Sequence, residues 1–431
     1  MIRQLWMQRW IAVGRGAIAL PIIGLTACNP SPSSQDPNTV TILGSITGDG
    51  ATVIQQVFEP FTEATGIQVN YVGDASFATL LPVQVAGGNP PDLALFPQPG
   101  LMADLAREGA LVPLDPFLDA DALAAAYDPN WLDLGRVDGQ VYGLWARADV
   151  KSLVWYRPDV FAAAGYEIPT TWDEMMDLTA AIAADGDVPW CLGMESGAAS
   201  GWVGTDWVED ILLRSAGPEV YDQWVAHEIP FNSPPVRDAF ERFGAIALSP
   251  DYVLGGPVGI LSTPFGDSPL PMFDDPPGCY LHRQTNFIST FFPPDVVVGD
   301  DVAIFPLPEI DPAIGQPVLV AGTAFGMLND TPAARAVMDY LLTPTPHETW
   351  VRLENYVSPH RQVSPTAYQD TVTQQQAEML ANAEIVRFDA SDLMPGAVGT
   401  GTFWSGMVDY VGGADLDEVL DTVDESWPSS P

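Results

Sequence analysis

The sequence predicts an α/β protein. Short β-branched segments alternate along the chain with longer segments whose apolar residues recur at helical intervals. Hydrophobic residues make up 47% of the 431 residues, which is enough to bury a large core, and the length favours two or three domains. We therefore expect a sheet rich in parallel strands with helices packed on it.

The elements can be assigned in order. Those expected in the first part of the chain are strand 38–46, helix 50–66, strand 67–73, helix 77–88, strand 91–96 and helix 100–114. Residues 166–186 form a further expected helix that begins after Thr171, with Glu174 three residues later as in a capping box. The Pro/Gly-rich stretches 255–278 and 306–317 are expected to be long loops or crossings between lobes.

The N-terminal residues have the composition of an export signal. Three arginines and no acid precede a short apolar run, which makes residues 1–27 a predicted signal peptide. The run ends in "LTAC", which resembles the lipobox of bacterial lipoproteins and makes Cys28 the predicted lipid-bearing residue, with a plain signal peptide as the alternative. Residues 28–37, rich in Ser, Pro and Asn, are a predicted tether.

The charge restricts the partners. The chain has 56 acidic and 16 basic side chains, a formal net charge of −40, so it repels the phosphates of nucleic acids. The acids are scattered, which indicates a solvated surface around a folded body rather than a disordered tail. A saline habitat would account for this acidity, although charge reports on solubility and not on fold.

Two cysteines remain in the mature chain, Cys191 and Cys279. An even number of cysteines in an exported protein favours a disulfide, and two buried free thiols are the alternative. The four histidines are scattered and no pair of histidines or cysteines has zinc spacing, so no metal site and no cofactor are expected.

Catalytic signatures are absent from the sequence, whereas tryptophans are abundant. There is no Gly-x-Ser-x-Gly motif, and "GSITGDG" lacks the Lys of a phosphate loop. Of the thirteen tryptophans, Trp145, Trp202 and Trp404 lie beside turn residues rather than inside apolar runs. An aromatic face with polar groups nearby suits a sugar ring, which indicates carbohydrate binding.

Six segments in order resemble one family. They are "ITGDGATVIQQVFEPFTEATGIQVNYV", "GGNPPDLALF", "REGALVPLD", "DGQVYGL…LVWYRPDVFAAAGYEIPTTWDEM", "AIFPLPEI" and "FWSGMVDYVGGADLDEVLD". Together they look like the extracellular solute-binding proteins that feed carbohydrate ABC importers. The cysteine pair, "CYLHRQTNF" and "FDASDLMPG" further resemble the α-glucoside-binding branch of that family.

The resemblance implies a fold, a function and a location. The implied fold has two α/β lobes of the periplasmic-binding-protein type, joined by a hinge that the chain crosses several times. Lobe one would comprise 38–147 and 306–357, and lobe two 148–305 and 358–431. The implied function is a non-enzymatic, monomeric receptor outside the cytoplasm, held on a bacterial membrane by its lipid, which delivers an oligosaccharide to an ABC permease by lobe closure.

The same resemblance implies ligand-binding residues. Asp49 matches an acid that binds sugar hydroxyls, Gln98 follows a strand at its carboxyl end, and Trp404 matches an aromatic at a helix start. The structural alternatives are a helix N-terminal acid, a turn residue and core packing, respectively. The remaining predicted ligand contacts are Trp145, Trp202, Asp206 and Gln284.

Lys151 is the last predicted contact. It is the one lysine in a chain with fifteen arginines, and the resemblance places it near the lobe junction. A compact ammonium cannot be replaced by a planar guanidinium, so we expect Lys151 to donate to sugar hydroxyls or to pair with Asp49 or Asp206. A chance survivor on the surface is the alternative. Where many family members have "YNKD" and "YGLP", this chain has "YRPD" and "YGLW", which leaves the sugar open.

Two other functions fit the same sequence. A secreted glycoside hydrolase or lyase would need a pair of carboxylates about 5 to 10 Å apart at a cleft. A binding protein of the same fold for a cationic or peptide ligand would suit the acidity.

Overall fold

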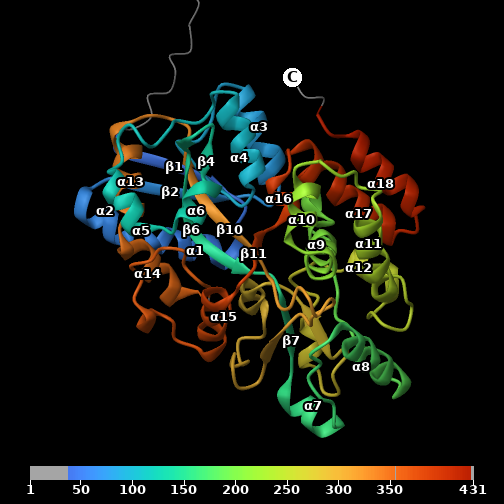
Figure 1. The fold of residues 1–431 in the computed structure, drawn as a ribbon. Helices are drawn as coiled ribbons and strands as arrows, with labels where there is room; N and C mark the ends of the chain where they lie inside the picture. The colour runs from blue at the N-terminus through green and yellow to red at the C-terminus, as the bar shows by residue number, and fades with distance from the viewer. Residues whose placement is uncertain (1–36, 355, 429–431) are drawn as a thin grey trace, which may run out of the picture. The chain divides into compact units, whose positions relative to one another are not determined.

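The computed structural model describes residues 37–354 and 356–428 (Figure 1). The predicted signal peptide, the predicted lipid-bearing Cys28 and all of the predicted tether except Pro37 lie outside the described residues. Among the helices of the part that is described, none is long and apolar enough to cross a membrane.

The largest sheet has six strands. Its order is β11-β10-β3-β1-β2, and β6 pairs with β10 off this path. The strands are β1 (Thr39–Gly44), β2 (Gln68–Gly73), β3 (Leu93–Phe96), β6 (Gly143–Val150), β10 (Val318–Met327) and β11 (Val386–Phe388). β1 is parallel to β2 and β3, and β11 is parallel to β10, but β10 is antiparallel to β3 and β6. The α/β class is confirmed, and the sheet is mixed, with three parallel and two antiparallel strand pairs.

Two smaller sheets complete the β structure of the described residues. One is a three-stranded antiparallel sheet in the order β8 (Leu281–Arg283), β7 (Leu153–Tyr156) and β9 (Ala303–Pro306). The other is a hairpin of β4 (Arg136–Val137) and β5 (Gln140–Val141). β7 follows β6 after two residues, Lys151 and Ser152, so the chain passes from the large sheet to the three-stranded sheet at the lone lysine.

The helices follow the predicted order with one break. The predicted helix 50–66 is two helices, α1 (Gly48–Val57) and α2 (Glu59–Thr65). Pro60 has no backbone N–H, so it cannot donate the hydrogen bond that would continue α1, and it lies instead in the first turn of α2. α3 (Phe77–Ala86) and α4 (Pro99–Arg107) lie where helices were predicted. The predicted capping box is present at α8 (Trp172–Ala184), where Thr171 Oγ1 accepts from the backbone N–H of Glu174 at 3.3 Å.

The remaining helices cover the sheets on several sides (Figure 1). In chain order they are α5 (Ala120–Ala126), α6 (Pro129–Leu134), α7 (Pro158–Ala164), α9 (Trp202–Ala216), α10 (Pro218–Val225), α11 (Pro234–Ala247), α12 (Gly256–Ser262), α13 (Pro332–Leu341), α14 (Pro344–Leu353), α15 (Thr371–Asn382), α16 (Ala390–Leu393), α17 (Trp404–Val411) and α18 (Leu416–Glu425). Short single turns are η1 (Gly197–Ala199), η2 (Leu270–Phe273), η3 (Asn286–Phe291) and η4 (Pro365–Ala367), and the π-helical segment η5 (Ala397–Phe403) leads into α17.

Two hydrophobic cores lie within the compact unit that begins at Asn38. The first core surrounds the six-stranded sheet, and the second is formed largely by α8 to α12, α17 and α18. Several short segments contribute residues to both cores, among them 150–154, 318–320 and 388–390. The chain passes from one core to the other at such segments, and the predicted lobe boundaries remain a prediction.

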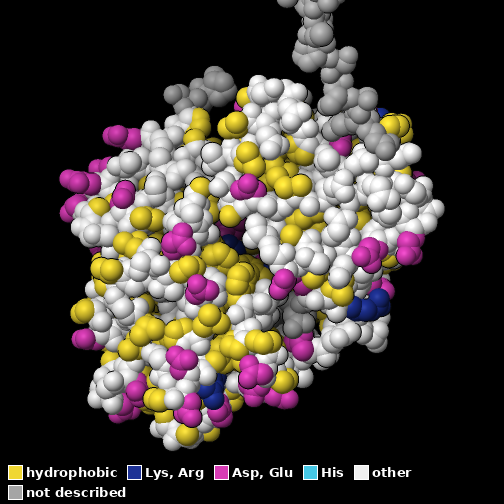
Figure 2. All heavy atoms as spheres, turned by 180° about the vertical axis from the view of Figure 1, so that it is seen from behind, with side chains coloured by type: hydrophobic (Ala, Val, Ile, Leu, Met, Phe, Trp, Pro, Cys, Tyr) yellow, Lys and Arg dark blue, Asp and Glu magenta, His cyan; other side chains and the backbone are white. Residues whose placement is uncertain are grey.

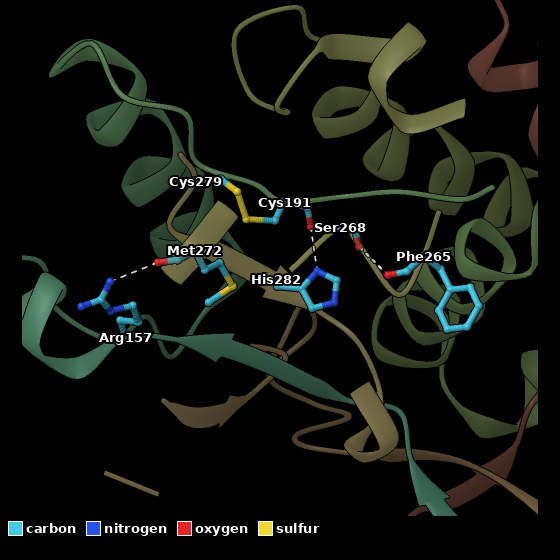
Figure 3. Close-up of a disulfide and its surroundings, with 7 residues drawn as sticks. All are labelled: Arg157, Cys191, Phe265, Ser268, Met272, Cys279 and His282. Atoms are coloured by element: carbon cyan, nitrogen blue, oxygen red, sulfur yellow. Dashed lines mark hydrogen bonds between the residues drawn. A yellow bond between two sulfur atoms is a disulfide. The ribbon is translucent and has the colours of Figure 1, made fainter. Parts of the chain in front are cut away.

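The predicted disulfide is confirmed. Cys191 and Cys279 are bonded, and the bridge ties residues 88 positions apart. Figure 3 shows the imidazole of His282 beside the bridge, with its Nδ1 hydrogen-bonded to the carbonyl of Cys191 at 2.8 Å. The backbone N–H of Phe265 donates to the carbonyl of Glu195, four residues after Cys191, at 3.0 Å, and Ser268 Oγ donates to the Phe265 carbonyl at 2.7 Å (Figure 3).

Candidate functional site

A cavity of about 690 Å³ is lined by residues that belong to, or lie beside, both cores. The surface in Figure 2 is hollowed near its centre, where hydrophobic side chains gather and a basic side chain is visible inside the hollow. This volume lies in the range of sites that enclose small-molecule ligands.

The large sheet supplies one side of the cavity through the ends of its strands. Residues 45–50 follow β1, and Pro97 and Gln98 follow β3, so both loops lie at the carboxyl ends of parallel strands, where open α/β sheets bind ligands. The β1 loop fits closely because Gly73 has no side chain. A Cβ atom there would lie 1.9 Å from the Ile46 carbonyl oxygen.

The side chains of Lys151, Asp206, Asp389 and Asp392 form what we call the polar wall. All four line the cavity and are at most 7% exposed. Lys151 Nζ donates to Asp206 Oδ1 at 2.6 Å and also to Asp389 Oδ2. The lysine therefore joins α9 to the loop after β11, and it uses two of its three donors.

Burial and charge set the protonation of this wall. At Lys151, burial opposes the charged form, but the carboxylates of Asp206 and Asp389 outweigh it and raise the pKa well above its usual value. Burial raises the pKa of Asp206 to about 7, because Lys151 offsets only part of the desolvation. Burial and the neighbouring Asp389 raise the pKa of Asp392 well above its usual range. This favours a protonated Asp392, which donates as well as accepts.

Lys151 also occupies the place that a cation would take. Oxygens of Asp206, Glu209 and Asp389 lie within 4.8 Å of one another, and this is the one group of potential metal ligands among the described residues. Because the ammonium of Lys151 hydrogen-bonds to two of these carboxylates, the chain supplies the positive charge itself.

Three buried polar atoms of the lining residues have no hydrogen-bond partner in the protein. They are Gln98 Oε1, Asp206 Oδ2 and Thr323 Oγ1. A buried polar atom without a partner costs about 1 to 3 kcal/mol, so these atoms favour a ligand that donates hydrogen bonds.

The side chains of Trp202, Phe265, Phe287 and Phe291 form what we call the aromatic wall. All four line the cavity. Trp202 contacts Phe265 edge-on with ring centroids 5.2 Å apart, and Phe265 contacts Phe291 at 5.3 Å. Phe291 is 42% exposed, which is unusual for so large an apolar side chain and leaves its ring available to a ligand.

Arg147 lies between the aromatic wall and the large sheet. Its guanidinium lies 5.4 Å from the ring of Phe287 and 5.5 Å from that of Tyr356, and its Nε donates to Asp149 Oδ1 at 2.7 Å. Glu354 lies 3.9 Å from the same guanidinium. Burial opposes the charge of Arg147, but Asp149 and Glu354 outweigh it, so its pKa is raised.

Six of the eight predicted ligand contacts line the cavity: Asp49, Gln98, Lys151, Trp202, Asp206 and Trp404. Trp145 and Gln284 do not. Trp145 is 1% exposed and packs on Trp131 and Phe388. Gln284 is 1% exposed, and its Oε1 accepts from the backbone N–H of Thr285.

A β-bulge explains the position of Trp145. The pairing of β6 with β10 shifts at Ala146, so Trp145 pairs with Ala324 and Arg147 pairs with Thr323. Because Thr323 and Ala324 are adjacent in β10, their side chains point to opposite faces of the sheet, and so do those of Arg147 and Trp145. Simple alternation would have placed Trp145 and Arg147 on one face. The bulge directs Arg147 to the cavity and Trp145 into the core.

Sequence reasoning missed several lining residues. They are Arg147, Asp149, Phe265, Phe287, Phe291, Thr323, Glu354, Asp389 and Asp392. Asp389 and Asp392 belong to "FDASDLMPG", a stretch that the sequence analysis linked to the α-glucoside branch without assigning a role to its acids. Phe265 lies in a loop and Phe287 and Phe291 in the short segment η3, and no sequence signal distinguished these phenylalanines from core residues.

The two cores, the segments that pass between them and the cavity define a two-lobed solute-binding protein. Solved structures with this fold include a "Chitin oligosaccharide binding protein" (TM-score 0.78, 20% identity, 90% of this chain and 98% of that one) and "Maltose bound T. maritima MalE3" (TM-score 0.73, 17% identity, 90% and 98%).

Residues 44–348 match the family model described as "Bacterial extracellular solute-binding protein", and the chain belongs to this family. It is 57% identical to the "Osmoprotective compounds-binding protein GgtB" of Synechocystis sp. over 95% of this chain and 98% of that protein. It is 43% identical to the "Alpha-glucosides-binding periplasmic protein AglE" of Rhizobium meliloti over 91% and 87%. The chain is therefore an extracellular solute-binding protein and not an enzyme.

Proposed function

We propose that this protein captures a short oligosaccharide, an α-glucoside, and delivers it to the permease of an ABC importer when its lobes close on the ligand. The observation that carries the proposal is the pairing, in one cavity, of buried acceptors without partners and an aromatic wall. A sugar has both surfaces that this requires, hydroxyl groups around its edge and an apolar C–H face.

The charges of the cavity support a neutral ligand. Six acidic side chains line it, and Arg147 and Lys151 are its two basic ones, so an anion is repelled. Both basic groups are paired with carboxylates, which leaves acceptors in excess of donors. A neutral polyol supplies the missing donors without adding charge. One relative is named for binding osmoprotective compounds and the other for binding α-glucosides, and both names are compatible with such a ligand.

The proposed roles follow from position. Asp49, Gln98 and Asp206 accept from sugar hydroxyls, and the third donor of Lys151 completes the set. Trp404 offers a ring at the start of α17, where its Nε1 donates to Ser391 Oγ at 3.4 Å, and Trp202 belongs to the aromatic wall.

A thermal-shift screen against mono-, di- and trisaccharides tests the proposal. A sugar at 100 times its dissociation constant adds about 2.7 kcal/mol to the free energy of unfolding, so we expect a clear rise in melting temperature with α-linked glucosides. The second candidate is a cationic ligand, which the excess of lining carboxylates favours. Stabilisation by spermidine or a cationic peptide, with no response to any saccharide, would replace the proposal with that candidate.

A pair of isosteric variants separates binding from stability. Thr323→Val removes a buried hydroxyl that has no protein partner, so we expect unchanged or higher stability and weaker sugar binding. Thr179→Val is the matched control, because its hydroxyl is buried in α8 and accepts from Trp190 Nε1 at 3.1 Å. We expect it to lower stability and leave the affinity unchanged.

We also propose that Cys28 carries a lipid that tethers the protein to the outer side of a bacterial membrane. The support is the "LTAC" sequence after a short apolar run. Expression of the full chain in bacteria should give a membrane-bound, lipid-labelled protein, and Cys28→Ala should abolish the labelling. Labelling that persists in Cys28→Ala would contradict the anchor and leave the sugar proposal intact.

A further inference from the structure

Helix α9 contacts three of the segments that contribute residues to both cores, 150–154, 318–320 and 388–390. Twelve consecutive residues of α9, from Val203 to Arg214, are buried, including the four charged residues Asp206, Glu209, Asp210 and Arg214. Charged residues are rarely buried without partners, so their contacts show what this helix holds.

The first two segments are joined at Ser152. Its hydroxyl donates to Asp210 Oδ1 of α9 at 3.0 Å and accepts from the backbone N–H of Leu319 at 2.9 Å. The Ser152 carbonyl accepts from the N–H of Leu307 at 3.0 Å. Arg214 adds a second link, because its Nη2 donates to the Pro317 carbonyl at 2.8 Å.

The third segment is held at Glu209. Its carboxylate accepts from the backbone N–H groups of Ala390 and Ser391 at 2.9 and 3.1 Å. Lys151 in the first segment then joins Asp389 in the third segment to Asp206 in α9. All three segments are therefore fixed to one helix by buried charged hydrogen bonds.

Asp206 belongs both to this network and to the ligand cavity. Its Oδ1 accepts from Lys151, whereas its Oδ2 has no hydrogen-bond partner and lies 3.7 Å from Arg283 Nη1. A ligand hydroxyl that donates to Oδ2 would therefore bind the same carboxylate that accepts from Lys151. The binding event and the junction between the cores thus share one group.

We propose that α9 is the anchor of the hinge, and that Ser152, Glu209 and Asp210 are positioning residues that set ligand affinity through Asp206 and Lys151 without lining the cavity. This inference rests on the proposed lobe closure. None of the three is among the cavity-lining residues, so their effect on binding has to act through the position of the segments.

The test compares Ser152→Ala and Glu209→Gln with Thr179→Val, whose buried hydroxyl in α8 has no hydrogen bond to segments 150–154, 318–320 or 388–390. Small-angle X-ray scattering gives the radius of gyration of each protein without and with ligand, and a tryptophan fluorescence titration gives the dissociation constant of the best saccharide from the thermal-shift screen. We expect both hinge variants to change the ligand-free radius of gyration and to alter sugar affinity roughly fivefold or more. Thr179→Val should match the wild type in both readouts.

The outcomes separate the two proposals. If the wild type does not become more compact with any saccharide, lobe closure on a sugar is wrong. If the wild type compacts and the folded hinge variants behave like Thr179→Val, the anchor is wrong. Because the two variants act on different segments, one that fails to fold, judged by near-ultraviolet circular dichroism, leaves the other as the deciding measurement.

Discussion

The polar wall and the aromatic wall face the same cavity but are supported in opposite ways. Lys151, Asp206 and Asp389 hold one another through buried ionic hydrogen bonds and are 5% exposed or less. The aromatic wall consists of rings that touch at edges, carried by α9, η3 and the loop with Phe265, and Phe291 is 42% exposed. A change in the polar wall leaves charges without partners, whereas a change in the aromatic wall removes only contact area. A change in the polar wall should therefore lower both stability and ligand affinity, and a change in the aromatic wall should lower mainly ligand affinity.

The largest effect is expected for Lys151→Met. It leaves Asp206 and Asp389 facing each other without their cation, and breaking a buried ion pair in this way costs about 3 to 5 kcal/mol of stability. Urea unfolding measures the loss. Lys151→Arg should not restore the wild type, because a longer planar fork does not fit the place of a compact ammonium.

The matched control is Arg335→Met, which removes a cation from the exposed pair with Asp330. We expect little change in its free energy of unfolding, since exposed ion pairs contribute little. If Lys151→Met matches this control in free energy of unfolding and in sugar affinity, the lone lysine has no special role and the contrast between the walls is wrong.

Loss of the disulfide comes next. Cys191→Ser with Cys279→Ser opens a loop of 88 positions, and we expect roughly 2 to 4 kcal/mol of lost stability in urea unfolding. Phe265, in the loop beside the bridge, should then be held less firmly, so sugar affinity falls as well. Reduction of the wild-type protein should reproduce both changes. Equal stability of the reduced and oxidised forms would show that the bridge does not support the aromatic wall.

Truncation of ligand-facing rings is expected to act mainly on affinity. Phe287→Ala should weaken sugar binding by roughly 1 to 3 kcal/mol in titration calorimetry, the range for burial of a large apolar side chain. Trp404→Ala should lose a similar amount, with some loss of stability because Trp404 is 6% exposed. Phe117→Ala, on the ring that stacks with Arg335 outside the cavity, is the control for binding. Normal affinity in folded Phe287→Ala would remove that ring from the site.

The smallest effect concerns pH, and its sign distinguishes His282, beside the disulfide, from Asp206 of the polar wall. Burial lowers the pKa of His282, beside the disulfide, to about 4, so the unfolded chain binds more protons than the folded one between about 4 and 6.5. The stability contributed by neutral His282 is present above 6.5 and is lost as the pH falls. The loss reaches about 1.4 kcal/mol at roughly pH 5.5, one pH unit below the unfolded pKa.

Asp206 should respond in the opposite direction. Its pKa is raised to about 7, so the folded state binds more protons, and its contribution to stability increases as the pH falls through 7. Urea unfolding between about pH 4 and 7 measures both effects. The free energy of unfolding should fall less steeply with decreasing pH in His282→Asn than in the wild type, and should fall less steeply with increasing pH in Asp206→Asn. Profiles in both variants that match the wild type would show that neither group sets the pH dependence.

The sequence alone determined the class of fold, the order of the elements, the capping box at Thr171 and the pairing of Cys191 with Cys279. These are consequences of local patterns, of the export signal and of cysteine number, which can be read without knowing how the chain folds back on itself. Six of the eight predicted ligand contacts line the cavity, and their contact with a ligand remains a prediction.

The tertiary structure decided what those residues face. A one-residue bulge in β6 turned Trp145 into the core and Arg147 to the cavity, and pairing across distant segments placed Asp389 against Lys151. The aromatic wall is assembled from α9, η3 and the loop that carries Phe265, which are separate in sequence and show no common pattern. Strand alternation and helical periodicity specify which face a residue lies on within its own element. Which elements meet is set by packing over the whole chain, so the hinge anchor and the cavity walls emerge only in three dimensions.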